Sequence, residues 1–239
     1  MDTGPMKIRA AVPQPTLLEP GGQSCELLLI RHGRSADVVP GTAEAADPGL
    51  HPEGRRQVEA LAARLAPKKL DAVYASHLRR AVETAAALAE PRGLELQTDP
   101  DLQEVLLGDW GQGEFRRRAA ERDPEWVAWS RTRRWDGIPG GEGDDALRAR
   151  VVQAVDRVAE RHPGGTTAVV VHGGVINAYL AEVFGVHHSL WLTVENTSIT
   201  VVRITVDGGD VAHHVVVAND CHHLYDPVLG PGASAPANQ

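Results

Sequence analysis

Arginine and histidine residues stand at the carboxyl ends of three short apolar runs in this chain. They are Arg31-His32-Gly33, Ser76-His77-Leu78-Arg79-Arg80 and His172-Gly173-Gly174. The planar guanidinium group of arginine matches the oxygens of a phosphate and stays ionised at any working pH. An imidazole with a pKa of about 6.5 is largely uncharged near neutral pH, so histidine can act as a nucleophile there. If the three segments meet, they predict a local anion site.

The three apolar runs, residues 26–30, 70–76 and 166–171, have the length and composition of strands that are buried on both faces of a sheet. Helical spacing and turn signals predict helices at 53–66, 78–90, 144–161 and 175–184, and further strands at 94–98, 198–206 and 211–218. Alternating strands and helices predict an α/β fold, a three-layer α/β/α sandwich around a mostly parallel mixed sheet. Ligands of such sheets bind beyond the carboxyl ends of the strands, so the three segments are expected to converge.

Composition divides the chain into a central domain and two flanking segments. Residues 1–24 and 226–239 are rich in Pro, Gly, Ala, Ser or Gln and are predicted to be flexible tails, which leaves a domain at 25–225. Within it, residues 108–143 contain four tryptophans and the arginine clusters 116–118 and 131–134, and are predicted to form a small helical and loop cap. The tryptophans are expected either to pack inside this cap or to stack on a ligand. The arginines are either a solvated surface or a charged rim for an anionic substrate.

Charge and hydropathy exclude several classes of protein. Of 239 residues, 32 are acidic and 24 are basic, so the net charge of −8 argues against a nucleic-acid partner. No apolar run approaches the roughly 18–20 residues of a membrane span, and no signal peptide is expected at the N-terminus. Two cysteines cannot form a disulfide scaffold and indicate a reducing, cytoplasmic location. A homo-oligomer is compatible with the sequence.

Four motifs, in this order along residues 26–224, resemble those of the histidine phosphatase superfamily, the phosphoglycerate mutase-like family. The four are Leu29-Ile30-Arg31-His32-Gly33, the segment from Ser76 to Ala85, Leu102-Gln103-Glu104 followed by Gly108-Asp109-Trp110-Gly111, and Val170-Val171-His172-Gly173-Gly174. A single Arg-His-Gly tripeptide is a weak signal, because it recurs by chance. Four motifs, each at the end of its expected element, are a strong one.

The resemblance implies a role for five residues. His32 is the implied nucleophile, which takes the phosphoryl group onto an imidazole nitrogen, and Glu104 is the implied proton donor to the leaving alcohol. Arg31 and Arg80 are implied to hold the phosphate oxygens, with His172 as a second histidine that stabilises the charged transition state. The carboxylates at Asp101, Asp109 and Glu114 are alternatives to Glu104 as the proton donor. These roles describe a phosphatase for a small phosphorylated metabolite, with catalysis by charge neutralisation and positioning.

Three departures bear on the function. Relatives carry an Asn that contacts phosphate where this chain has Val38, so no contact is assigned there. Residues 39–50 lack the Phe-x-Gly-Trp-x-Asp signature of the mutase branch, which favours a hydrolase over the alternative of a phosphoglycerate mutase. A binding module without turnover is a second alternative, against which the five intact residues argue.

Adjacent histidine pairs suggest the further alternative of a metal site. They are His187-His188, His213-His214 and His222-His223. Neighbouring residues on a strand point to opposite faces, and no Cys/His spacing resembles a zinc site. No metal and no cofactor are therefore expected. Asn196 is expected either to brace the pocket or to serve only a turn.

Overall fold

A single six-stranded sheet forms the centre of the protein, whose computed structural model describes residues 24–207 and 210–225. Its strands, in chain order, are β1 (Ser24–Arg31), β2 (Ala72–Ala75), β3 (Leu96–Thr98), β4 (Thr166–Val171), β5 (Ile199–Asp207) and β6 (Asp210–Asp220). Their order in space is β3-β2-β4-β1-β5-β6. The strands β3, β2, β4 and β1 are parallel, β5 is antiparallel to β1, and β6 is antiparallel to β5. The sheet is thus mixed and mostly parallel, as predicted.

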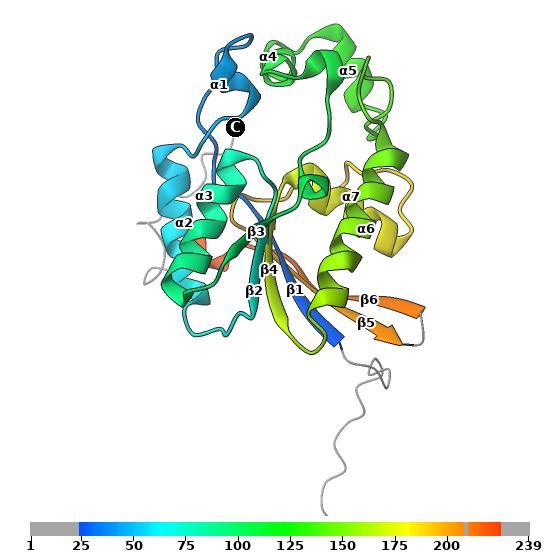
Figure 1. Ribbon diagram of the computed structural model, residues 1–239. Helices are drawn as coiled ribbons and strands as arrows, with labels where there is room; N and C mark the ends of the chain where they lie inside the picture. The colour runs from blue at the N-terminus through cyan, green and yellow to red at the C-terminus, as the bar shows by residue number, and fades with distance from the viewer. Residues whose placement is uncertain (1–23, 208–209, 226–239) are drawn as a thin grey trace, which may run out of the picture.

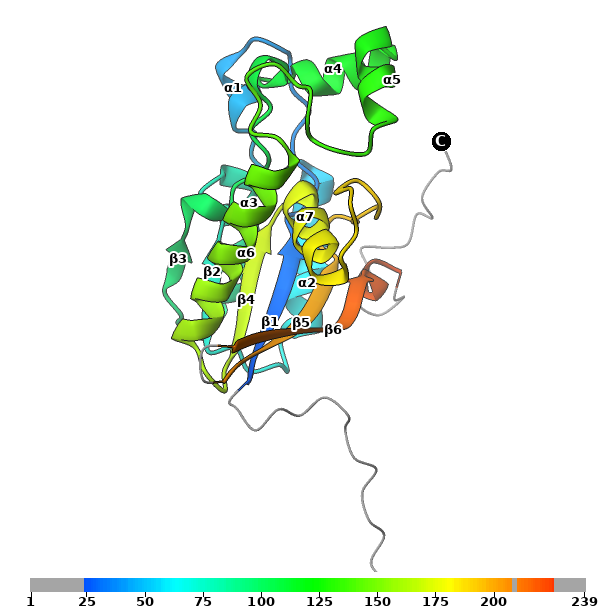
Figure 2. The same cartoon turned by 90° about the vertical axis from the view of Figure 1, so that its right-hand side faces the viewer.

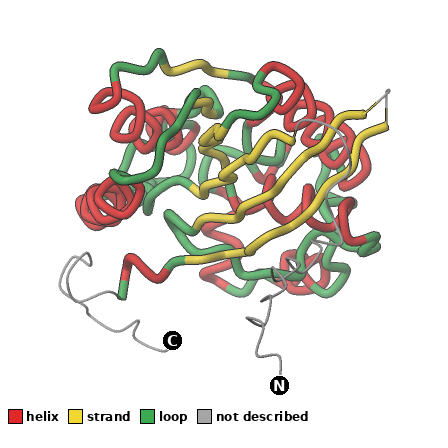
Figure 3. The backbone as a smooth tube through the Cα atoms, turned by 90° about the horizontal axis from the view of Figure 1, so that it is seen from below, coloured by secondary structure: helices red, strands yellow, loops and turns green. Residues whose placement is uncertain are grey.

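Helices cover both faces of the sheet and also lie above it. They are α1 (Ala43–Ala46), α2 (Pro52–Leu65), α3 (Arg79–Ala89), α4 (Glu114–Glu121), α5 (Pro124–Ser130), α6 (Asp144–Arg161) and α7 (Gly173–Phe184). Figures 1 and 2 show α2 and α3 on one face, α6 and α7 on the other, and α1, α4 and α5 above the sheet. From below, the strands lie between helices on both sides (Figure 3). The predicted three-layer sandwich is confirmed.

Two apolar cores follow from this arrangement, because the central strands are covered on both faces. Leu28, Ile30 and Val170 face the α2–α3 layer, whereas Leu29 and Val171 face the α6–α7 layer. Alternate residues of a strand point to opposite faces. A strand that is buried on both faces therefore reads as a continuous apolar run, which is the pattern seen in β1 and β4.

Most element boundaries agree with the sequence to within two residues. The predicted helix at 144–161 and strand at 166–171 have those bounds in the structure. The helix predicted at 175–184 instead begins at Gly173, directly after the extended residue His172. Glycine has a low helix propensity, so the sequence pattern placed the start too late. The first turn of α7 consequently lies at the carboxyl end of β4.

The segment 108–143, named here the cap, contains α4, α5 and a cluster of aromatic rings. Trp110, Trp129 and Trp135 are buried, and the rings of Trp110 and Trp129 meet edge to face with centroids 5.6 Å apart. Phe115 lies edge-on to Trp129 at 5.4 Å. The tryptophans therefore pack mainly on one another, which is the first of the two expectations stated for them.

The predicted tails at 1–24 and 226–239 lie outside the described residues, except for Ser24, which begins β1. Gly208 and Gly209, between β5 and β6, also lie outside them. Among the described residues, no helix combines the length and apolar character that crossing a membrane requires.

Candidate active site

The neighbouring strands β2, β4 and β1 bring the three arginine- and histidine-bearing segments to one edge of the sheet. Parallel strands place their carboxyl ends together, and these three strands are adjacent in the order β2-β4-β1. His32 follows β1, Arg80 lies in the first turn of α3 after β2, and His172 follows β4. The structure thus brings these residues together, as the sequence predicts.

His32 is buried, and its hydrogen bonds define its tautomer. Its Nδ1 lies 2.7 Å from the carbonyl oxygen of Gly33, which can only accept, so Nδ1 carries the proton. The Nε–H of Arg80 donates to His32 Nε2 at 3.2 Å, so Nε2 is an acceptor with a lone pair. Burial, together with the charges of Arg80 and Arg31, lowers the pKa of His32 well below its ordinary value of 6.5. The free protein therefore presents a neutral imidazole with an available Nε2.

Arg31 and Arg80 bring two guanidinium groups beside this imidazole. Arg80 is buried, and its Nη1 lies 3.8 Å from a carboxylate oxygen of Asp47. Arg31 donates from Nη1 to the backbone carbonyl of Val194. Burial lowers the pKa of both arginines, and the negative charge of Glu104 opposes that effect. Both remain cations because the guanidinium group does not lose its proton in proteins.

His172 is fully buried, with its ring centroid 4.9 Å from that of His32. Neither of its ring nitrogens has a hydrogen-bond partner among the described residues. Burial, with His32 and the two arginines acting in the same direction, lowers the pKa of His172 well below 6.5. Buried polar atoms are usually paired, so these nitrogens mark a place that suits a bound polar group.

Glu104 reaches the pocket from the loop after β3, and its carboxylate lies against the start of α7. The Gly174 N–H donates to Glu104 Oε2 at 3.4 Å, and the backbone N–H of Val105 donates to Oε1 at 3.1 Å. A Cβ on Gly174 would stand closer than 3.0 Å to Glu104 Oε1, so any other residue at position 174 would displace the carboxylate from this position. By contrast, a Cβ on Gly173 would make an ordinary 3.5 Å contact with Arg31 Nε.

The alternative carboxylates are differently placed. Glu114 accepts hydrogen bonds from Arg117 and Arg118, which lower its pKa to about 2 and keep it ionised. Asp101 is bound to Arg157. None of Glu114, Asp101 and Asp109 lines the pocket that holds Glu104.

A pocket of about 440 Å³ opens above these groups, between the segment after β1 and the cap. The charged side chains that line it are Arg31, Arg80, Arg116 and Glu104, with His32 at its base. Much of the remaining wall is apolar and consists of Ala45, Ala46, Pro48, Leu78, Val105, Leu106, Leu107, Trp110, Phe115 and Trp135. An anionic group can thus bind at the base while an apolar body packs above it.

Several supporting contacts come from residues to which the sequence analysis gave no definite role. Asn196 donates from Nδ2 to the carbonyl oxygen of His32 at 2.8 Å, which is the bracing role considered for it. The Gly33 N–H donates to Thr84 Oγ1 at 3.1 Å. Thr84 belongs to the second motif, so a signal for it existed. The contact between Arg31 and the Val194 carbonyl could not be predicted from residue types, because a backbone carbonyl is the acceptor and its position depends on the loop conformation alone.

The histidine pairs have other surroundings. His213 Nδ1 lies 2.8 Å from the Tyr179 hydroxyl, and His213 Nε2 lies 3.2 Å from Asp156. Within the described ranges, no group of three or more His, Cys, Asp or Glu side chains is arranged to hold a metal ion.

Comparison with known proteins identifies close relatives of this chain. Phosphoglycerate mutase-like protein 4 of Arabidopsis thaliana is 36% identical over 201 residues, which cover 79% of this chain and 86% of that protein. The metal-independent phosphoserine phosphatase of the same plant is 35% identical over 161 residues, or 64% of this chain and 66% of that protein. The solved structure of Bacillus stearothermophilus YhfR has a TM-score of 0.70 at 30% identity, and the match covers 84% of this chain and 99% of that one.

The family model of the histidine phosphatase superfamily (branch 1) matches residues 27–216, which contain all five residues of the predicted site. The match extends from β1 into β6 and so includes every strand of the sheet. On this evidence the chain belongs to the histidine phosphatase superfamily.

Proposed function

We propose that the protein hydrolyses small phosphate monoesters through a phosphohistidine formed at His32 Nε2, without a metal ion. The observation that carries this proposal is the tautomer of His32: Nδ1–H is held by the Gly33 carbonyl, and an unprotonated Nε2 lies beside Arg80. The relative named metal-independent phosphoserine phosphatase supports the same chemistry. Since both cysteines are free thiols, we also propose a reducing, cytoplasmic location.

In the first step, the Arg80 Nε–H leaves His32 Nε2 for a phosphoryl oxygen, and the freed lone pair of Nε2 forms a bond to phosphorus while the bond from phosphorus to the ester oxygen breaks. Arg31 and Arg80 neutralise charge on the phosphoryl oxygens, which is the main task in phosphoryl transfer, and the neutral His172 contributes a hydrogen bond. A phosphoryl oxygen can accept from the one N–H of the neutral His172 ring, which gives one of its two unpaired nitrogens a partner. The leaving oxygen takes a proton from the carboxylic acid of Glu104.

In the second step, water attacks the phosphorus atom and the bond to Nε2 breaks. The Glu104 carboxylate accepts a proton from that water, so it returns to its acid form and inorganic phosphate leaves. His32 returns to the neutral tautomer of the free enzyme. Both steps use the same groups, and the residue that donates the proton in one accepts it in the other.

The test compares His32→Ala with His77→Ala, since His77 also follows a strand at this edge but is exposed and does not line the pocket. Each purified variant is mixed briefly with p-nitrophenyl phosphate, quenched, and examined by intact mass for a phosphorylated protein. His32→Ala should form no phosphoprotein and should keep less than about a tenth of the wild-type kcat. His77→Ala should behave as the wild type.

Product analysis separates hydrolysis from the alternatives. A phosphatase releases inorganic phosphate and alcohol in equal amounts, whereas a mutase moves the phosphoryl group to another hydroxyl and releases little phosphate. A binding module forms no phosphoprotein. A folded His32→Ala variant with near wild-type turnover would overturn the assignment of the nucleophile.

A further inference from the structure

Three consecutive arginines on α4 have different surroundings. Arg117 and Arg118 are each ion-paired with Glu114, and further carboxylates, among them Glu121 and Glu125, surround them. Arg116 forms no ion pair with a carboxylate of the described chain. It donates instead to the Ser35 hydroxyl at 3.0 Å and to a backbone carbonyl at 3.2 Å. Two of the three arginines are thus held in ion pairs within the cap, whereas Arg116 bonds only to neutral groups.

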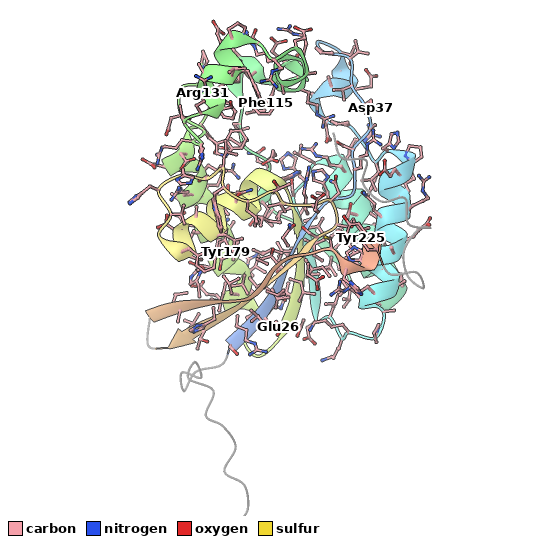
Figure 4. The ribbon with its side chains drawn as sticks, turned by 180° about the vertical axis from the view of Figure 1, so that it is seen from behind. Glu26, Asp37, Phe115, Arg131, Tyr179 and Tyr225 are labelled. Carbon is pink, nitrogen blue, oxygen red and sulfur yellow. The ribbon has the colours of Figure 1, made fainter. Side chains whose placement is uncertain are left out.

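Arg116 reaches across the mouth of the pocket. Its two hydrogen bonds join α4 in the cap to Ser35 and Ala36, which follow β1. Figure 4 labels their sequence neighbours Phe115 and Asp37, which lie on the two separate arms above the sheet. Arg116 lines the pocket, and its positive charge contributes to lowering the pKa of His32 and Arg80. Its guanidinium group is therefore close to the groups that would hold the scissile phosphate.

No carboxylate among the side chains that line the pocket forms an ion pair with this third guanidinium group, although the negative charge of nearby Asp37 acts on Arg116 from outside the lining. Arg31 and Arg80 lie beside His32 and would bind the phosphoryl dianion, and Asp47 already lies 3.8 Å from Arg80. Glu104 must be protonated to donate to the leaving group, so it adds no negative charge at that stage. Neither Asp37 nor Asp47 lines the pocket. A second anionic group on the substrate would give the Arg116 guanidinium group an ionic partner inside the pocket.

We propose that Arg116 is a specificity-determining residue, which binds a second anionic group on the leaving alcohol of the substrate. This inference rests on the phosphatase activity proposed above and narrows its substrate class to monoesters that also carry a carboxylate or a second phosphate. The apolar walls contact the body of the leaving group, and Arg116 binds its charged end. A guanidinium group suits either anion because its N–H groups match paired oxygens.

The experiment compares substrates that differ only in the second charge. Alkyl phosphates of increasing chain length are assayed beside phosphorylated hydroxy acids and alkanediol bisphosphates of the same lengths. The enzymes are the wild type, Arg116→Met, Arg116→Lys and the matched control Arg117→Met. Thermal unfolding of each variant verifies that the fold is retained. The measured quantity is kcat/KM for phosphate release.

Arg116→Met should lower kcat/KM by about tenfold to a hundredfold for the preferred doubly anionic series, the usual range for a hydrogen bond to a charged group. The plain alkyl phosphates should change little. Arg116→Lys should restore part of the preference, and Arg117→Met should match the wild type. Whichever series is affected identifies the second anion as carboxylate or phosphate. Added salt should weaken the wild-type preference, because Arg116 is exposed at the mouth.

Three outcomes would overturn the inference while leaving the phosphatase intact. An equal loss for charged and plain esters would show that Arg116 acts on the shared phosphoryl group. No loss for either class, or no wild-type preference for doubly anionic esters, would make Arg116 an ordinary surface cation. A wild-type protein that forms no phosphoprotein with any substrate would instead refute the proposed function, and the inferred substrate class, which rests on that function, would be refuted as well.

Discussion

Replacing Gly174 by alanine should displace the proposed proton donor without touching the phosphate-binding groups. The new Cβ would stand closer than 3.0 Å to Glu104 Oε1 and 3.3 Å from Glu104 Cδ, whereas ordinary contact begins at 3.4 Å. The ring of Trp135, whose Cζ2 would be 3.3 Å away, limits movement of the new methyl group in the other direction. The carboxylate must therefore retreat, by on the order of 0.5–1 Å.

A displacement of this size is large for a catalytic group. Misplacement by about 1 Å can cost about a hundredfold in rate, and general acid catalysis contributes about 10²–10⁴-fold in all. Gly174→Ala should thus slow phosphoenzyme formation from alkyl phosphates by roughly tenfold to a hundredfold. The same step with p-nitrophenyl phosphate should change little, because nitrophenolate leaves without a proton. Glu104→Gln should slow phosphoenzyme formation from alkyl phosphates even more, and should again change the same step little with p-nitrophenyl phosphate.

The assay is rapid-quench measurement of phosphoenzyme formation, since only this step depends on the leaving group. Gly173→Ala is the matched control, because its Cβ would make only an ordinary contact with Arg31. Thermal unfolding of both variants is measured beside the wild type, so that a loss of rate in a folded variant cannot be attributed to unfolding. Equal slowing for alkyl and aryl esters, or no slowing at all, would refute the placement of Glu104 as the donor.

Two further predictions concern metal dependence and pH. EDTA should leave activity unchanged while vanadate, which adopts the five-coordinate geometry of phosphoryl transfer, inhibits at low concentration; loss on chelation that Mg²⁺ or Zn²⁺ restores would contradict this. Because burial lowers the folded-state pKa of His32 and His172, only the unfolded chain binds their protons just below pH 6.5. Stability is therefore complete above about pH 6.5 and is lost on acidification, by up to about 1.4 kcal/mol per pH unit for each histidine. The free energy of unfolding, measured with urea at several pH values in this range, should depend less steeply on pH in His172→Asn, by about one proton. An unchanged pH dependence would count against a buried neutral His172.

The sequence alone determined the layers of the fold and the edge at which the site lies. Continuous apolar runs such as those of β1 and β4 indicate strands buried on both faces, and the helical spacing over residues 144–161 predicts α6 with its observed bounds. These features are local periodicities, which neighbouring residues encode. The motifs around His32 and His172 identified the two histidines for the same reason, because each motif closes a strand.

The tertiary structure decided which groups surround those histidines. The tautomer of His32 depends on Arg80, which lies 48 residues away in sequence, and Arg31 is held by the carbonyl of Val194, whose position no side-chain pattern encodes. Three identical arginines at 116–118 were equivalent in the sequence, and only the packing of α4 against the segment after β1 turned Arg116 to the pocket. Contacts of this kind depend on loop conformation and on how distant elements pack, which one-dimensional periodicity does not specify.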